Sequence, residues 1–186
     1  MFVIGSMHIV EWLDEPGLNS ILKKFRRSLV PFSAEELDKP HWEVVEYGYE
    51  HLIEVCVALS MVSDGIAFRH VVSLLTGDRP KLHKIYRRAF LEAESGQGAS
   101  IDISSNDGRK ISIAGVYLDF LSVARQGGML TTTGPRALDP WEALERFMGA
   151  YWGLHPRPPI RLSQLATEAV RLAEAAPEVK RGPKRK

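Results

Sequence analysis

The chain has one cysteine, no long hydrophobic run and almost no net charge, and each absence excludes a class of protein. Because Cys56 is alone among 186 residues, no disulfide can form within the chain and no multi-cysteine zinc site is available. No stretch approaches the roughly 18 apolar residues of a membrane span, and the first residues lack the pattern of a secretory signal. We therefore expect a soluble cytoplasmic protein with no membrane partner, associated with the nucleoid if it binds DNA.

Bulk charge does not identify a partner. The formal net charge is +1; residues 1–95 hold eleven Lys or Arg against fourteen Asp or Glu, and residues 96–186 hold thirteen against nine. Neither half is basic enough to indicate nucleic-acid binding by itself. Any such prediction must rest on three local clusters of cations, which occupy residues 23–27, 79–88 and 180–186.

Sequence signals for catalysis and for bound cofactors are missing as well. Gly96-Gln-Gly98 lacks the helix and the Lys-Ser/Thr pair of a phosphate-binding loop. His51 and Glu54 stand one helical turn apart, which suits two metal ligands, but without a third ligand a surface or packing role is favoured. Cys56 falls on an apolar stripe, where a thiol is typically packed and inert. We expect no enzymatic activity, no metal and no cofactor.

The most informative positive feature is a helix with two different faces, predicted from Leu18 to about Ser28. Apolar residues recur along it at helical spacing, while the segment from Pro16 to Pro31 carries four cations and no acid. At about 3.6 residues per turn the two groups fall largely on opposite sides. The apolar set is Leu18, Ile21, Leu22, Phe25 and Leu29, and the cations are Lys23, Lys24, Arg26 and Arg27. An outward row of cations suits contact with phosphates, and an ordinary solvated face remains the alternative.

The remaining periodicity predicts a helical first half and a mixed second half. Ser33 and Glu36 have the spacing of a helix capping box, and Asn106-Asp-Gly108 between two alternating runs indicates a β-hairpin. The predicted helices cover residues 4–13, 18–28, 33–37, 49–62, 67–75, 79–94, 116–123, 140–152 and 162–175. The predicted strands cover residues 42–47, 99–104 and 110–114, and a loop is expected within 126–135.

Four short motifs in the first 75 residues follow one another in a known order. They are Phe2-Val-Ile-Gly5, Leu22-Lys-Lys-Phe-Arg-Arg27 with the exit Leu29-Val-Pro31, Tyr49-Glu-His-Leu-Ile-Glu54, and Gly65-Ile66 continuing to Leu75. Over about 70 residues, their order resembles the MerR type of winged helix-turn-helix transcriptional regulator. The resemblance implies double-stranded DNA as partner, a homodimer, and residues 18–28 as the recognition helix in the major groove. Half-sites would then lie about one helical turn apart.

The expected fold class is α+β, mostly α, with a boundary at Ser95-Gly-Gln-Gly98. Residues 1–94 would form the winged helix-turn-helix domain. Residues 98–176 would form an α+β module for dimerisation or partner binding, with a β-hairpin and two or three helices. Residues 177–186 would be a disordered basic tail.

The expected DNA contacts follow from the resemblance and the cation clusters. In the recognition helix they are Asn19, Ser20, Lys23, Lys24, Arg26 and Arg27, the first two as readers of base edges. The wing would add Lys39 and His41. Further phosphate contacts are expected from Lys81, Lys84, Arg87, Arg88, Lys184 and Arg185.

A protein-interaction module is the alternative function. In an antitoxin-like or adaptor protein, residues 98–176 would hold a protein partner and DNA binding would be secondary or lost. The near-neutral charge and the acidic wing residues Glu43 and Glu46 favour this alternative. An aromatic set in this half is predicted to form its core, or a partner surface if exposed. The set consists of Trp141, Phe147, Tyr151 and Trp152.

Overall fold

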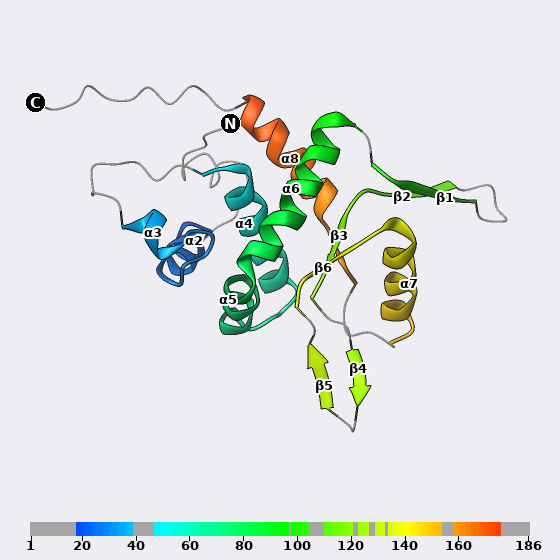
Figure 1. The fold of residues 1–186 in the computed structure, drawn as a ribbon, viewed down its shortest axis with the longest axis horizontal. Helices are drawn as coiled ribbons and strands as arrows, with labels where there is room; N and C mark the ends of the chain where they lie inside the picture. The colour runs from blue at the N-terminus through cyan, green and yellow to red at the C-terminus, as the bar shows by residue number, and fades with distance from the viewer. Residues whose placement is uncertain are drawn as a thin grey trace, which may run out of the picture.

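The computed structural model describes residues 18–38, 47–96, 98–104, 110–120, 123–126, 129–132, 134–153 and 158–175. These residues form a mixed α and β fold in which helices predominate, as the sequence predicts (Figure 1). The predicted helix at 4–13, most of the predicted strand at 42–47, the hairpin turn at 105–109 and the tail from 177 lie outside the described residues. Within the described ranges, no helix is long and apolar enough to cross a membrane.

The helices of the first half match the predicted ones within a few residues. Their apolar spacing is local information, so their positions can be read directly from the sequence. They are α2 (Leu18–Arg27), α3 (Ala34–Leu37), α4 (Tyr49–Ser63), α5 (Phe68–Gly77) and α6 (Arg79–Ser95). The predicted capping box is confirmed, because the Ser33 hydroxyl accepts a hydrogen bond from the Glu36 N–H and the Glu36 carboxylate accepts one from the Ser33 N–H.

Helix α4 is the central helix of the structure. The sequence predicts one apolar stripe along it, but every residue from Leu52 to Ala58 is buried. Helices α5, α6 and α8 (Leu162–Ala175) all pack against it, so that it is covered on several sides (Figure 1). A helix surrounded in this way is apolar around most of its circumference, and Glu54 is the exception that matters below.

The predicted hairpin is present as strands β1 (Ser100–Ser104) and β2 (Lys110–Ala114). They pair antiparallel with Ile101 opposite Ile113. The expected helix at 116–123 is wrong, because residues 117–119 form strand β3 (Tyr117–Asp119) between β6 (Arg136–Leu138) and β7 (Ile160–Arg161). A short apolar run does not distinguish a buried strand from a helix. Here the hydrogen-bonded pairing of both edges of β3, with β6 and with β7, makes the segment a strand.

The loop expected within 126–135 is partly wrong as well. Strands β4 (Val123–Gln126) and β5 (Met129–Thr132) pair antiparallel as a two-stranded hairpin. Two glycines stand between them in the sequence, a dipeptide that favours a tight hairpin turn. Figure 1 shows this hairpin projecting from the rest of the fold.

The last two helices divide between two cores. Helix α7 (Pro140–Tyr151) packs on β1, β2 and β6, and its Ala143 joins a small cluster with Tyr117 and Leu138. Helix α8 packs on α6 and α4 instead. The main core therefore contains residues from both sides of the Ser95–Gly98 break, among them Phe25, Val57, Leu82, Leu118 and Leu162.

Gly115 allows strand β3 to approach the start of α8. Its φ is +86°, and a Cβ atom there would lie 2.1 Å from the Ser163 Oγ and 2.4 Å from the Ser163 Cβ. The same Ser163 accepts a hydrogen bond from the Val116 N–H at 2.6 Å and donates its own N–H to the Val116 carbonyl. A glycine is thus required both by the backbone angle and by the close approach.

Candidate nucleic-acid interface

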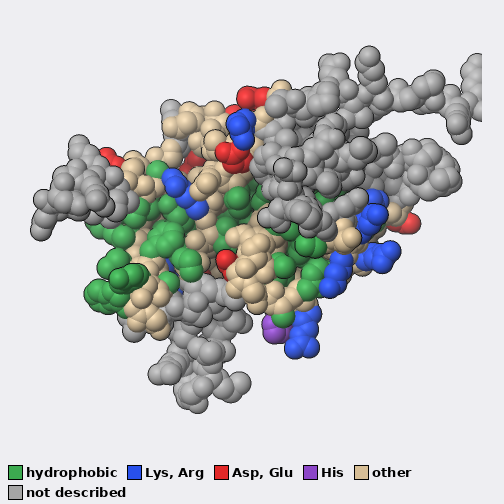
Figure 2. All heavy atoms as spheres, turned by 180° about the vertical axis from the view of Figure 1, so that it is seen from behind, with side chains coloured by type: hydrophobic (Ala, Val, Ile, Leu, Met, Phe, Trp, Pro, Cys, Tyr) green, Lys and Arg blue, Asp and Glu red, His purple; other side chains and the backbone are tan. Residues whose placement is uncertain are grey.

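Helix α2 presents the two faces that the sequence predicts. Leu22 and Phe25 are buried, whereas Lys23, Lys24, Arg26 and Arg27 are all exposed, as is Ser20. Lys and Arg side chains gather on the side of the molecule that carries α2 (Figure 2). Three of the four cations lie in the last turn, where they also interact favourably with the negative end of the helix dipole.

The four cations are not equivalent. The Lys24 ammonium lies 4.3 Å from the centroid of the Phe68 ring, at the start of α5, a favourable cation–π distance. Phe68 also contacts Phe25, with ring centroids 4.8 Å apart, so α5 supports α2 at this point. Lys23 and Arg27 are exposed one helical turn apart, so they can contact an outside partner together.

Helix α2 ends in a Schellman motif. The Val30 N–H bonds to the Phe25 carbonyl at 3.0 Å, and the Leu29 N–H bonds to the Arg26 carbonyl at 3.2 Å. Phe25 and Val30 are both buried and belong to the same core cluster, which is the hydrophobic contact typical of this motif. Leu29 occupies the left-handed position with φ 59°, where glycine is usual. The direction of α2 is thus set by both backbone hydrogen bonds and core packing.

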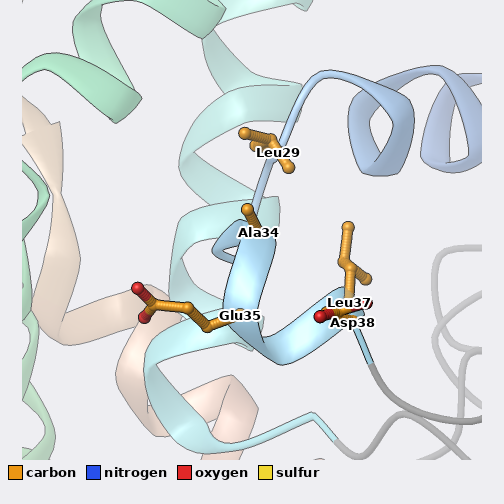
Figure 3. Close-up of a pocket in the computed structure, with 5 residues that line it drawn as sticks. All are labelled: Leu29, Ala34, Glu35, Leu37 and Asp38. Atoms are coloured by element: carbon orange, nitrogen blue, oxygen red, sulfur yellow. The ribbon is translucent and has the colours of Figure 1, made fainter.

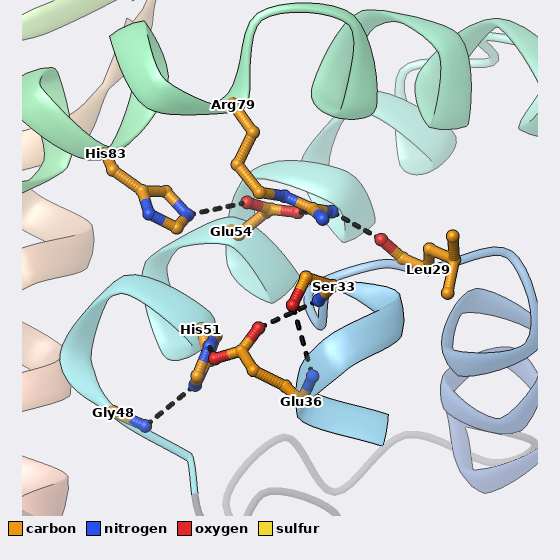
Figure 4. A network of polar contacts seen from close by, with 8 residues as sticks. All are labelled: Leu29, Ser33, Glu36, Gly48, His51, Glu54, Arg79 and His83. Atoms are coloured by element: carbon orange, nitrogen blue, oxygen red, sulfur yellow. Dashed lines mark hydrogen bonds and ion pairs between the residues drawn. The ribbon is translucent and has the colours of Figure 1, made fainter. Parts of the chain in front are cut away.

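A buried ion pair holds this turn to the rest of the molecule (Figure 4). Arg79, the first residue of α6, donates from Nη2 to the Leu29 carbonyl and, at 2.9 Å, to the Glu54 carboxylate on α4. The Glu54 side chain is fully buried and that of Arg79 is 15% exposed. Glutamate is almost never fully buried unless it is paired. One side chain therefore connects the end of α2 with both α4 and α6.

The sequence-based interpretation missed this ion pair. It considered Glu54 beside His51 as a surface or packing residue or a metal ligand, and it considered Arg79 only as the first cation of the cluster at 79–88. The available signal was the position of Glu54 between Ile53 and Val55, in the most apolar part of the helix. Its partner lies 25 residues away, a separation that helical periodicity cannot detect.

Two further polar side chains adjoin the buried carboxylate. His83 Nε2 lies 3.6 Å from Glu54 Oε2. Burial raises the pKa of Tyr86 well above its ordinary value, and the negative charge of Glu54 raises it further. Within the described residues, neither the Tyr86 hydroxyl, the His83 Nε2 atom nor Glu54 Oε2 has a hydrogen-bond partner. Arg79 therefore provides most of the interaction that compensates the buried charge of the Glu54 carboxylate.

His51 has a packing role, which the sequence favoured over a metal site. Its Nδ1 atom accepts a hydrogen bond from the Gly48 N–H, so Nε2 carries the proton and donates to the Glu36 carboxylate at 3.0 Å. Burial raises the pKa of Glu36, but hydrogen bonds from Ser33 and the adjacent His51 outweigh it, and the net pKa is lowered. This chain of contacts joins α3 to the start of α4 (Figure 4).

An acidic hollow lies beside the end of α2. It measures about 470 Å³ and is lined by Leu29, Ala34, Glu35, Leu37 and Asp38 (Figure 3). Glu35 and Asp38 are both exposed. Carboxylates repel phosphates, so a nucleic-acid backbone would contact the cationic face of α2 rather than this hollow.

The second predicted cluster lies on the exposed side of α6. Lys81, Lys84, Arg87 and Arg88 are all exposed, and Arg88 pairs with Glu92 at 2.9 Å. The beginning of α6 adjoins the turn after α2 through Arg79, so this cluster starts near the end of α2. The predicted contacts Lys39, His41, Lys184 and Arg185 lie outside the described residues, as does the side chain of Asn19.

Arg69 is a cation that the sequence-based prediction omitted. It is exposed and follows Phe68, whose ring contacts Lys24 and Phe25 of α2. Because only tertiary packing brings the start of α5 beside α2, no local signal pointed to it. Arg69 is therefore an exposed cation on α5, next in the chain to a residue that contacts α2.

The aromatic set of the second half is divided between core and surface. Phe147 contacts Tyr117, with ring centroids 5.7 Å apart. The prediction that the set forms a core is wrong for its other members, since Trp141, Tyr151 and Trp152 are 63%, 84% and 67% exposed. The alternative interpretation, an aromatic surface available to a partner, fits these three side chains.

No family model, curated protein or solved structure matches this chain. Among the residues that the structure describes, no three His, Cys, Asp or Glu side chains come together in a way that could hold a metal ion. A functional proposal must therefore rest on the geometry of the chain itself.

Proposed function

We propose that this chain is a sequence-specific DNA-binding transcriptional regulator that acts as a dimer. Its first 94 residues would form a winged helix-turn-helix domain of the MerR type, with α2 in the major groove. One observation carries the proposal: α2 exposes four cations on one face, while its opposite face and its C-terminal turn are fixed to the core. A rigidly held basic helix can position side chains against phosphates and base edges together.

The individual residues would have distinct roles. Lys23 and Arg27 would contact phosphates or bases directly, and Lys24, positioned over Phe68, would contribute mainly charge. Ser20, exposed near the start of the helix, could reach a base edge. Arg69 would add a phosphate contact from α5. The proposal assigns the chain no catalytic step.

A salt titration of DNA binding tests the proposal. The probe is a labelled mixed-sequence duplex, followed by selection of tighter-binding sequences from a random pool. Lys23→Ala with Arg27→Ala should weaken binding and reduce the salt slope by about 1.8 per chain, since each phosphate contact contributes about 0.9. Arg161→Ala with Arg171→Ala is the control, because it removes the same charge from exposed positions on β7 and α8.

Two results would count against the proposal. Equal losses in the two double variants would show that binding depends only on total charge. Absence of binding to any duplex at low salt, with the wild-type chain folded, would exclude the function.

A second candidate is the antitoxin-like or adaptor function. The exposed aromatic side chains of α7 favour it, because exposed aromatic residues commonly anchor protein interfaces. Purification from the native host at moderate salt distinguishes the two candidates. A different protein recovered in fixed stoichiometry, whose binding is lost when Trp141 is changed to Ser, would support the second.

A further inference from the structure

An apolar stripe runs along the outer side of α7. Trp141 and Met148 of α7 and Trp152, which caps its C-terminal end, are spaced by seven and four residues, so they lie on nearly the same line. Their exposed fractions are 63%, 46% and 67%, and Tyr151 at the edge of the stripe is 84% exposed. Hydrophobic side chains gather on the side of the molecule that carries α7 (Figure 2).

The stripe is not needed to hold α7 in place. The opposite side of the helix already packs on the small core, through Ala143, Leu144 and Phe147. At the roughly 200 Å² that an aromatic side chain typically buries, the exposed fractions of the three aromatic residues correspond to about 400 Å² of accessible aromatic surface. The largest apolar patch on a typical monomer measures about 300–600 Å² and is often functional, and the α7 stripe falls within that range.

We propose that the α7 stripe is the interface through which two copies of this chain form a symmetric dimer. A twofold axis places the same patch on both sides of an interface. With the two α7 helices antiparallel, Trp141 of one copy meets Trp152 of the second, and Met148 lies close to the axis. This inference rests on the proposed function, which requires a dimer, and it identifies the α7 stripe as the surface through which that dimer forms.

The available area suits a second copy of the chain. Two stripes contribute about 800 Å² of aromatic surface, and Met148 with the surrounding rim brings the pair to the roughly 1,000 Å² that a specific interface requires. Helix α7 lies on the opposite side of the molecule from α2 (Figure 1). Pairing through α7 therefore leaves both cationic α2 faces uncovered and free to bind DNA.

Sedimentation equilibrium without DNA, from low to high micromolar protein, tests the interface. The wild-type chain of 20.8 kDa should sediment as a dimer. Trp141→Ser with Trp152→Ser should yield a monomer with an unchanged far-UV circular dichroism spectrum, since each anchor tryptophan is worth about 30-fold or more in the dissociation constant. Leu91→Ser is the matched control: Leu91 on α6 is 51% exposed but lies off the stripe, and this variant should remain dimeric.

Disulfide crosslinking provides a test that does not depend on weakening the fold. Cys56 is buried, so Met148→Cys introduces an accessible thiol near the proposed axis. Mild oxidation should join the new thiols of the two copies by a disulfide. This crosslink should form much faster than the one between the two copies of a Gln164→Cys variant, whose new cysteine is exposed on α8. A monomeric wild-type chain, equal effects of the tryptophan and Leu91 variants, or equal crosslinking rates at positions 148 and 164 would each overturn the proposal.

The outcomes separate this inference from the DNA-binding function. Loss of dimerisation with DNA binding retained would refute the interface alone. A dimer with the expected tryptophan dependence that binds no duplex would refute the function and leave the interface standing.

Discussion

Replacing Arg79 with Met should destabilise the chain by about 3–4 kcal/mol, because it leaves the Glu54 carboxylate buried without its partner. The Glu54 side chain is fully buried, and its one hydrogen bond to Arg79 measures 2.9 Å. Removing one partner of a buried ion pair typically costs about 3–5 kcal/mol. The Leu29 carbonyl also loses a donor, a further cost of about 1 kcal/mol, while His83 at 3.6 Å offers partial compensation.

Urea denaturation followed by circular dichroism measures the loss in the free energy of unfolding. Thermal unfolding gives a second measure, because for a chain of this size a loss of about 3 kcal/mol lowers the melting temperature by about 6–12 °C. Arg88→Met is the matched control, since the Arg88–Glu92 pair is exposed and such pairs contribute about 0–0.5 kcal/mol. Arg79→Met combined with Glu54→Leu should recover much of the loss, because no buried charge then remains.

Two results would refute the reasoning. If Arg79→Met and Arg88→Met differ by less than about 1 kcal/mol, the ion pair does not hold the turn after α2. If the double variant is no more stable than Arg79→Met alone, the loss comes from packing of the arginine stem rather than from the unpaired carboxylate.

Four further predictions follow from the backbone and from individual pKa shifts. Leu29→Gly should be more stable than Leu29→Ala by about 1 kcal/mol, because both variants lose the same side chain contacts and only glycine relieves the positive φ; equal stabilities in urea would contradict this. Gly115→Ala should cost at least about 2 kcal/mol through its clash with Ser163, whereas Gly77→Ala, which meets nothing within 4 Å, should stabilise α5 by about 0.5–1 kcal/mol. Burial raises the pKa of the Cys56 thiol to about 12, so Ellman's reagent at pH 8 should react only after urea is added, and rapid native labelling would show that α4 opens. The pKa of Glu36 is lowered from 4.5 in the folded state, so its stabilising effect is present above that value and disappears as the pH falls through the folded pKa; Glu36→Gln should therefore destabilise the chain at pH 7, and the difference from wild type should shrink as the pH is lowered below 4.5.

Local patterns in the sequence determined most of the helices and one hairpin. The spacing of Leu22 and Phe25 against the cations of α2 predicted both its buried and its exposed side. The capping box of Ser33 and Glu36 and the alternating residues of β1 and β2 were predicted for the same reason. In each case the interacting residues lie close together in the chain, so periodicity and turn chemistry carry the information.

The tertiary structure alone decided the parts that depend on distant segments. Strand β3 is a strand because β6 and β7 pair with its two edges, although its short apolar run resembled a helix. The Arg79 guanidinium reaches a carboxylate 25 residues earlier in the chain and a carbonyl 50 residues earlier. No local pattern encodes such a meeting, because it requires α4, α6 and the turn after α2 to be already packed together.

The same distinction applies to the candidate sites. The sequence by itself determined that α2 is cationic on one side and that α7 is rich in aromatic residues. Only tertiary packing decided that Lys24 lies over Phe68, and that Trp141 and Trp152 remain exposed. Composition records which side chains are available, whereas exposure depends on which neighbours cover them, and those neighbours come from distant parts of the chain.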